Sequence, residues 1–524
     1  MIAQIMAIAP QLGFVWPKRP EIVPHVTATS RPTPYQFARR SLSQYVFVRV
    51  VFRISLKSSS STLPINRMFA LISWSLGFPK PTFNEAISER ADRSARGGLL
   101  EHKHAQYNLG RATSRNDKRT GRKKLPIGTA VHERTFKLCE SLNYREWSGY
   151  YTVSAYEAHH EHEYNAIRNA CALIDVTPLY KYFITGADAT TFVNRVITRD
   201  IRKVSVGQVI YCCWCDEQGK VVDDGTISRL AENTYRWTAA DPSLRWFEQN
   251  ALGLDVKIED ISEKVAALAL QGPTSARLLR QIADADIANL KYFRVTHGKI
   301  ASVAVDISRT GYTGDLGYEI WMPWDEATKV WDELTAKGRQ FDLHPTGMLA
   351  LDVARIEAGL LLIEVDYTSS KKALIESQKY SPYEIGLGRM VNLEKEHFVG
   401  REALIEEHKR GAERQFVGLD INWDEVEALY DKIGLAPQVQ SAASRVAVPV
   451  YDVGGAHIGK ATSTTWSPTL KRMIALASIA TEYSKPGTKL KMEFTVEAVR
   501  HRVAAKVANL PFFNPPRKTA TPAL

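Results

Sequence analysis

Two neighbouring acids, Asp223 and Asp224, lie in a stretch of turn residues and short apolar runs at residues 216–227. Adjacent residues on an extended strand point to opposite sides, so one carboxylate can face a pocket while the other faces solvent or a neighbouring strand. A carboxylate in a pocket can hydrogen-bond an amine nitrogen, stabilise positive charge there, or orient the nitrogen that attacks. The plainer alternative is an acid pair that accepts hydrogen bonds from turn amides.

A second stretch, Ser-Arg-Thr-Gly-Tyr-Thr-Gly-Asp-Leu-Gly-Tyr-Glu-Ile at residues 308–320, is rich in glycine. Its glycines permit a tight turn and a close approach of the backbone to a flat ligand. The residues on either side predict two strands joined by that turn. Glu319, at the start of the second strand, can present its carboxylate to a heterocycle with N–H donors. Taken alone, the stretch also fits a plain glycine-rich hairpin.

Further short motifs follow in a fixed order. They are Gln-Gly-Pro at residues 271–273, Gly-Leu-Gly at 386–388, Gly-Arg-Glu-Ala-Leu at 400–404, Ile-Gly-Lys-Ala-Thr-Ser at 458–463 and Trp-Ser-Pro-Thr-Leu at 466–470. Each is weak alone, but the ordered combination is specific. In this order and spacing, residues 145–515 resemble the aminomethyltransferase (glycine cleavage system T-protein) family, which also includes tetrahydrofolate-dependent demethylases.

The resemblance implies an α+β fold, with a T-protein-like body of two subdomains around a central cavity and a C-terminal β-barrel domain. We therefore expect three regions. Residues 1–130 form a basic N-terminal extension that is disordered or spurious, residues 131–405 a folate-binding catalytic body, and residues 406–524 the barrel. Short alternating strand patterns after residue 415 and the Gly-Gly turn at 454–455 also favour a β-rich C-terminal domain.

The resemblance also implies tetrahydrofolate as the cofactor. The activity it implies is a one-carbon transferase that moves an aminomethyl-derived methylene or a methyl group from a donor to tetrahydrofolate. The family's catalytic acid maps to Asp223, which would position and polarise N10 of the cofactor. Residues assigned to cofactor binding are Glu319, Asp315 (where the family usually has Glu), Tyr312, Asp224 and Trp466. The implied partner is a small-molecule donor or a lipoylated carrier protein.

Two positions depart from the family pattern. Leu351 replaces an arginine that contacts the bound substrate in the family, and a leucine cannot donate a bidentate hydrogen bond. Residues 175–179 read Asp-Val-Thr-Pro-Leu, where T-proteins commonly carry Ser-His-Met after Asp-Val. One alternative is therefore a tetrahydrofolate-dependent demethylase of a small methylated amine, sulfonium or aryl ether. The other is a non-catalytic folate-binding accessory protein, ranked last because its Lys-Gly-Cys-Tyr-x-Gly-Gln-Glu stretch is missing.

The net charge of +11 belongs to the N-terminal region. Residues 1–130 contain 21 Lys and Arg against 6 Asp and Glu, which leaves a net charge of −4 on residues 131–524. The enzyme body therefore carries no electrostatic signature of nucleic-acid binding. The basic region fits a spurious upstream extension, an organellar transit segment or a basic tail. We expect a cytoplasmic protein, or a mitochondrial matrix protein if this region is a transit segment.

Other features argue against further classes of site. Five cysteines, an odd number, favour a reducing compartment over a disulfide framework. No apolar run approaches the roughly 18 residues that span a bilayer. The His-His-Glu-His run at 159–162 lacks the zincin spacing, so we predict no metal site.

Apolar spacing predicts helices over 157–174, 275–282 and 346–358.

Overall fold

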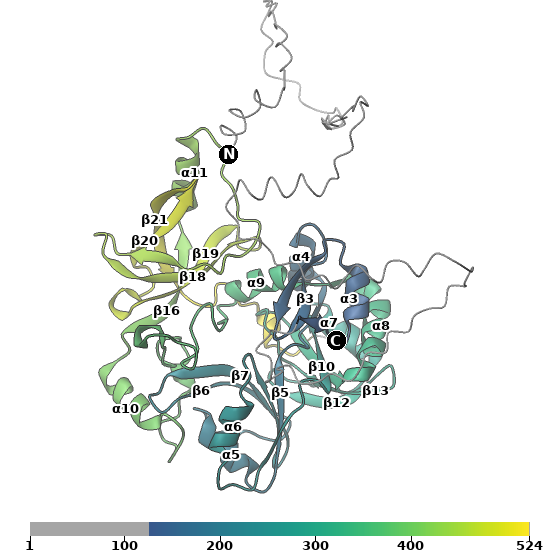
Figure 1. Cartoon of the computed structure of the whole chain (residues 1–524). Coiled ribbons are helices and arrows are strands. Elements are labelled where there is room, and N and C mark those ends of the chain that lie inside the picture. The colour runs from purple at the N-terminus through teal and green to yellow at the C-terminus, as the bar shows by residue number, and fades with distance from the viewer. Residues whose placement is uncertain (1–124, 523–524) are drawn as a thin grey trace, which may run out of the picture. The chain divides into compact units, whose positions relative to one another are not determined.

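The computed structural model describes residues 125–522 (Figure 1). The prediction for residues 1–130 therefore falls almost entirely outside the described residues. The described α-helices are α3 (His132–Leu138), α4 (Glu161–Asn169), α5 (Ala189–Val196), α6 (Leu244–Asn250), α7 (Ser275–Ile282), α8 (Ala327–Gly338), α9 (Met348–Glu357), α10 (Arg401–Arg410) and α11 (Trp423–Asp431).

A seven-stranded sheet, in the order β11-β12-β13-β14-β10-β4-β15, forms the first subdomain. Its strands are β4 (Cys171–Asp175), β10 (Val265–Gln271), β11 (Ala283–Asp284), β12 (Val295–Ile300), β13 (Val303–Ser308), β14 (Gly317–Pro323) and β15 (Leu343–Pro345). A smaller sheet comprises β1 (Ile127–Gly128), β3 (Tyr150–Ala155) and β2 (Asn143–Trp147).

Strand β10 carries Leu268 and Leu270 on one face of the seven-stranded sheet and Ala267 and Ala269 on the other, which we call the alanine face. On β10, Leu268 and Leu270 join a buried core that also contains Trp331 of α8. The alternate residues Ala267 and Ala269 belong to a separate buried cluster. Burying a leucine side chain contributes about 1.5–3 kcal/mol, so the leucine face fixes the helix layer. The alanine face leaves room for larger groups from other elements.

The second subdomain is a five-stranded sheet in the order β6-β7-β8-β5-β9. Its core lies against α5 and α6, where the rings of Trp237 and Phe247 are 4.4 Å apart and those of Trp214 and Trp237 are 5.1 Å apart. Its strands are β5 (Tyr180–Thr185), β6 (Val209–Cys215), β7 (Val221–Ala231), β8 (Thr234–Ala239) and β9 (Lys257–Asp260).

The chain ends in a closed barrel of six strands, in the order β16-β19-β18-β17-β20-β21, coloured green to yellow in Figure 1. Its strands are β16 (Arg414–Ile421), β17 (Val448–Tyr451), β18 (His457–Ser467), β19 (Arg472–Ala480), β20 (Lys489–Val496) and β21 (Val499–Ala508). Closure pairs every strand on both sides and so removes exposed sheet edges. The predicted α+β fold with a C-terminal β-barrel is thus confirmed.

The predicted helix over 157–174 is wrong at both ends. Helix α4 covers only Glu161–Asn169, and Cys171–Asp175 forms strand β4 instead. This strand pairs with β10 on one side and β15 on the other, so long-range hydrogen bonds decide its conformation against the local helical spacing. The helix predicted at 275–282 is confirmed as α7, and that at 346–358 as α9.

Candidate active site

The alanine face of the seven-stranded sheet carries the polar residues of the glycine-rich stretch. Residues on β14 alternate, so Glu319 and Trp321 share this face. Ser308 lies opposite Glu319 in the neighbouring strand, and Asp306 lies opposite Trp321. Residues paired directly across strands point to the same face. This face therefore combines two carboxylates, a hydroxyl and an indole.

An apolar cluster covers the same face, and we call it the site cluster. Leu351 of α9 is buried there with Trp321, and Tyr312 packs against them. The remaining members are Ile174, Val176, Ala267 and Ala269, with Trp147, Leu179, Val265 and Met348 packed against them. The residue that departs from the family's arginine is thus buried in the same cluster as the indole that flanks Glu319.

Glu319 is held by one hydroxyl. The side chain of Thr310 donates a hydrogen bond of 2.5 Å to Oε2, and Thr310 in turn contacts the Ser308 hydroxyl at 2.8 Å. Within residues 125–522, Oε1 accepts no hydrogen bond. Burial raises the pKa of Glu319, while the hydrogen bond from Thr310 and the charge of Arg236 oppose that rise. Glu319 is therefore a partly buried acceptor with one oxygen available to a ligand.

The glycines of this stretch make room for a glutamine. A Cβ at Gly311 or Gly317 would lie 2.1 or 2.2 Å from Oε1 of Gln271. The Gln271 amide donates to the carbonyls of Thr310 and Tyr318 at 3.3 and 3.2 Å. Gln271 thereby fixes the turn from β10, which explains the glycines without a ligand.

Asp224 faces a pair of tyrosines. The Tyr211 hydroxyl donates a hydrogen bond of 2.6 Å to Oδ2, and the Tyr367 hydroxyl donates to Oδ1. Burial raises the pKa of Asp224, and the two phenol hydrogen bonds act against that rise. Burial also raises the pKa of Tyr312, with Asp224 among the contributing charges, so Asp224 lies within electrostatic reach of the site cluster.

Asp223 has a different environment. It pairs with Trp214 across β6, whereas Asp224 pairs with Cys213, so the two side chains leave opposite faces of β7. Its carboxylate accepts three backbone N–H groups, from Asp224 at 2.7 Å, Asp241 at 3.0 Å and Ala240 at 3.2 Å. Burial, followed by the charge of Asp224, raises its pKa well above the usual value.

Three predicted cofactor ligands have protein partners. Asp315 is an ion-pair partner of Arg517, with distances of 2.7 and 2.9 Å, and its side chain is fully buried. Trp466 packs edge-on against Trp423 of α11, with ring centroids 4.9 Å apart, on the barrel core. Tyr312 donates a hydrogen bond to the carbonyl of Leu361. The assignment of all three to cofactor binding stays a prediction.

Buried ion pairs and hydroxyl groups of the barrel strand β18 hold α9 in place. Arg355 lies 2.6 Å from Asp366, whose other oxygen accepts from the hydroxyls of Thr462 and Ser463 at 2.6 and 2.7 Å. Glu357 accepts from Arg168 at 2.6 Å and from the hydroxyl of Ser467. These contacts fix the helix that carries Leu351.

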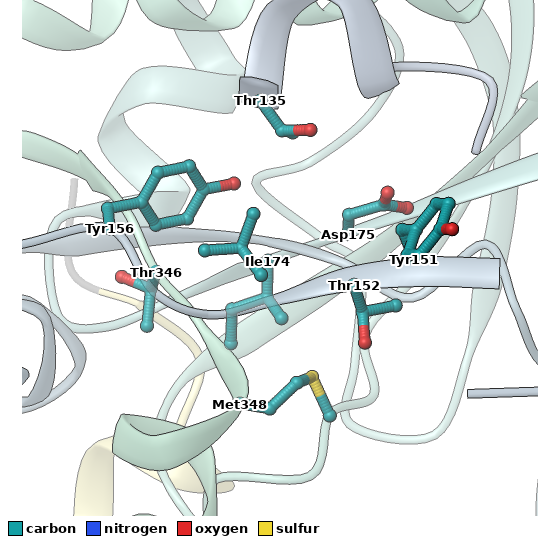
Figure 2. Close-up of a pocket in the computed structure, with 9 residues that line it drawn as sticks. Thr135, Tyr151, Thr152, Tyr156, Ile174, Asp175, Thr346 and Met348 are labelled. Atoms are coloured by element: carbon teal, nitrogen blue, oxygen red, sulfur yellow. The ribbon is translucent and has the colours of Figure 1, made fainter. Parts of the chain in front are cut away.

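A small cavity borders the site cluster, and Figure 2 shows the residues that line it. Ile174 and Met348 belong to both, and Asp175, Thr135 and Tyr156 supply its polar wall. Its volume of about 10 Å³ suits about one water molecule. Burial raises the pKa of Asp175, which accepts a 2.6 Å hydrogen bond from Thr129. The cavity is too small for a substrate. A surface hollow lies near His162 and His344.

Within residues 125–522, no three His, Cys, Asp or Glu side chains are grouped to hold a metal ion. Over the same described residues, no helix combines the length and the apolar character needed to cross a membrane.

Two family models match the chain. The GCVT N-terminal domain matches residues 133–395, and the glycine cleavage T-protein C-terminal barrel domain matches residues 433–514. The chain belongs to the glycine cleavage T-protein family. The family prediction made from the ordered motifs is thereby confirmed.

Relatives of this T-protein family member include curated aminomethyltransferases. The Moorella thermoacetica enzyme is 34% identical over 361 residues, covering 68% of this chain and 90% of its own. The Halalkalibacterium halodurans enzyme is 33% identical over 356 residues, covering 67% and 89%. A trimethylamine-oxide aldolase from Ruegeria pomeroyi is 31% identical over 409 residues, covering 75% of this chain and 48% of its own.

The fold is also that of a solved family structure. The glycine cleavage system aminomethyltransferase T from Bartonella henselae superposes with a TM-score of 0.62 at 23% identity, covering 74% of this chain and 98% of that one.

Sequence reasoning missed three polar residues of this T-protein site. Tyr211 and Tyr367 hold Asp224, and Arg236 of β8 stacks on Trp321 with its guanidinium carbon 4.5 Å from the ring centroid. One signal was available for Arg236, since it stands between two aromatic residues in a strand that is otherwise apolar or small. No comparable signal links the tyrosines to Asp224.

Proposed function

We propose that the chain is a tetrahydrofolate-dependent one-carbon transferase that moves a methylene or methyl group from a donor to tetrahydrofolate. The observation that carries the proposal is the Asp224 carboxylate, held by two phenol hydroxyls within electrostatic reach of the site cluster. Membership of the glycine cleavage T-protein family supports the same reaction class.

The described residues fit a reduced pterin. The free Oε1 of Glu319 can accept a hydrogen bond from ring N–H groups, and a fixed acceptor beside apolar walls is what binds a flat heterocycle. Trp321 and Leu351 offer such walls next to it. When bound, tetrahydrofolate supplies the nitrogen that accepts the one-carbon unit.

The amine-orienting role falls to Asp224 in this proposal. Its carboxylate can accept a hydrogen bond from an amine and stabilise positive charge near it, and both effects grow where water is excluded. Tyr211 and Tyr367 keep it oriented and favour its ionised form. Asp223 is bound differently, because its carboxylate accepts hydrogen bonds from three backbone amides and from no side chain among the described residues.

One observation favours a demethylase over glycine cleavage as the specific activity. Leu351 is 6% exposed and packs in the site cluster, so a donor bound beside this cluster would meet an apolar wall and not a guanidinium at this position. A small methylated amine, sulfonium or aryl ether presents an apolar surface to such a wall. The lipoylated carrier protein belongs to the glycine cleavage alternative, and the accessory-protein alternative needs no donor at all.

Turnover tests these alternatives. The full chain is incubated with tetrahydrofolate and each candidate donor, and formation of methylene- or methyl-tetrahydrofolate is followed. We expect product with at least one methylated donor and its loss in Asp224→Asn. Binding of tetrahydrofolate without turnover of any donor, and with no effect of Asp224→Asn, would instead support the accessory protein.

A further inference from the structure

The guanidinium of Arg236 is buried, and three of its five N–H donors have no hydrogen-bond partner among the described residues. The residue is 4% exposed, and its Nη1 atom pairs with Asp306 on the alanine face of the seven-stranded sheet. Among the described residues, Nε and Nη2 have no hydrogen-bond partner. Buried polar groups are nearly always paired, so such an orphan pair calls for an explanation.

The contacts of Arg236 place it at the candidate site although it belongs to the other sheet. Its guanidinium carbon lies 4.5 Å from the ring centroid of Trp321, a member of the site cluster. Its charge reaches Glu319, two residues before Trp321 on β14. Leu351 packs in the same cluster. A guanidinium thus stacks on a member of the same cluster in which leucine has replaced the family's arginine.

The unused atoms have a defined geometry. Nε–H and one Nη2–H of a guanidinium point the same way and form the fork that binds a carboxylate through two parallel hydrogen bonds. Asp306 occupies the Nη1 end and is itself contacted by His297 at 2.6 Å, so the fork cannot turn freely. Stacking on an indole further fixes the plane of the guanidinium.

We propose that the Nε/Nη2 edge of Arg236 is a binding subsite for a carboxylate of the reaction partners. The carboxylate comes either from the one-carbon donor or from the glutamyl tail of the folate. This inference rests on the proposed function for the location of the site and adds the chemical class that the site selects. In this proposal Arg236 is a binding residue and supplies a guanidinium where the family's arginine has been replaced by Leu351.

Binding equilibria of the full chain test the proposal in two arms, each comparing a carboxylate with its neutral amide. The donor arm uses N,N-dimethylglycine against its amide and 3-methoxybenzoate against 3-methoxybenzamide. The folate arm uses tetrahydrofolate against its glutamyl diamide. In at least one arm, we expect the carboxylate to bind at least tenfold more tightly than its amide. In Arg236→Gln this ratio of affinities should fall below threefold.

Matched variants separate recognition from folding. Arg236→Lys keeps the charge but not the fork, so it retains only part of the preference. Arg229→Gln, on the neighbouring strand β7, removes a guanidinium that bonds the carbonyls of Val204 and Glu232, and it keeps the full preference. Circular dichroism and thermal unfolding show whether each variant folds. If Arg236→Gln does not fold, the carboxylate preference measured for Arg236→Lys tests the proposal in its place.

The proposal is overturned if neither arm shows a preference for the carboxylate, or if the preference survives in Arg236→Gln. It is also overturned if Arg236→Gln weakens binding of 6-methyltetrahydropterin, which has no carboxylate, as much as that of tetrahydrofolate. Absence of tetrahydrofolate binding together with a carboxylate preference in the donor arm contradicts the proposed function and leaves this inference standing.

Discussion

Tyr211 donates a hydrogen bond of 2.6 Å to Oδ2 of Asp224, and the charge on Asp224 depends on it. A phenol that donates to a carboxylate stabilises the ionised form and so lowers the pKa of the acid. Burial acts in the opposite direction on the same group and is the larger influence. The proposed chemistry needs the ionised form, so the partner of this carboxylate sets the lower pH limit of activity.

Replacing Tyr211 with phenylalanine should therefore shift the acid limb of the pH profile. Loss of the hydrogen bond raises the pKa of Asp224, so the ionised form disappears at a higher pH and activity on the acid side falls. The pH dependence of kcat/KM measures this, because it reports groups of the free enzyme. Tyr483→Phe, on the barrel beside Asp452, is the control and should leave the profile unchanged. An unchanged profile in Tyr211→Phe would contradict the role given to Asp224.

The two acids should respond differently to amidation. Asp224→Asn should lower kcat by about 10²–10⁴-fold, the usual contribution of a positioned acid–base group. Asp223→Asn should mainly lower stability, by about 1–3 kcal/mol, because an amide NH₂ group then meets backbone donors. Steady-state kinetics and urea unfolding of both variants measure the two effects. If Asp223→Asn alone abolishes turnover, the assignment made from the sequence resemblance is correct and the one made from the geometry is wrong.

Gly317 should not tolerate a side chain. Alanine at this position would place its Cβ 2.2 Å from Oε1 of Gln271, which would have to leave the turn that it fixes. Overpacking of this kind costs about 1–3 kcal/mol. Thermal unfolding measures the loss, with Gly454→Ala as control, since its nearest neighbour is an Asp452 side-chain oxygen at 3.3 Å. Equal stability of the two variants would mean that Gln271 moves freely.

The buried ion pair between Arg355 of α9 and Asp366 should stabilise the protein more than a surface ion pair does. Asp366→Ala leaves Arg355 buried without its partner, which costs about 3–5 kcal/mol. Asp420→Ala removes a partner of Arg472, a half-exposed pair on the barrel, and costs about 0–1 kcal/mol. Urea unfolding of both variants makes the comparison. A loss in Asp366→Ala no larger than that in Asp420→Ala would show that this contact does not hold α9.

Local patterns predicted much of the fold because many helices and strands are determined by residues that are close together in the sequence. The strands around the glycine-rich stretch are β13 and β14, and the alternation that predicted them also separates Glu319 from the core. The helix predicted over 157–174 failed where β4 begins, since pairing with two distant strands is invisible to local spacing. Domain boundaries drawn at residues 130 and 405 stay predictions.

The site was less predictable because its contacts are long-range. Tyr211 and Tyr367 lie 13 and 143 residues from Asp224, and no pattern in one sequence connects them. The same holds for Arg236 and Asp306, 70 residues apart. Motif order was enough to place the acid pair in the family, whereas the different partners of the two carboxylates follow from the strand register that puts them on opposite faces of β7.

Calorimetric titration of the full chain with tetrahydrofolate is the sharpest test of the proposed cofactor. We expect one binding site per chain, with an affinity that falls at least tenfold in Glu319→Ala, because this change removes the acceptor beside the site cluster. No measurable binding to the unmodified chain, or an affinity that Glu319→Ala leaves unchanged, would contradict that proposal.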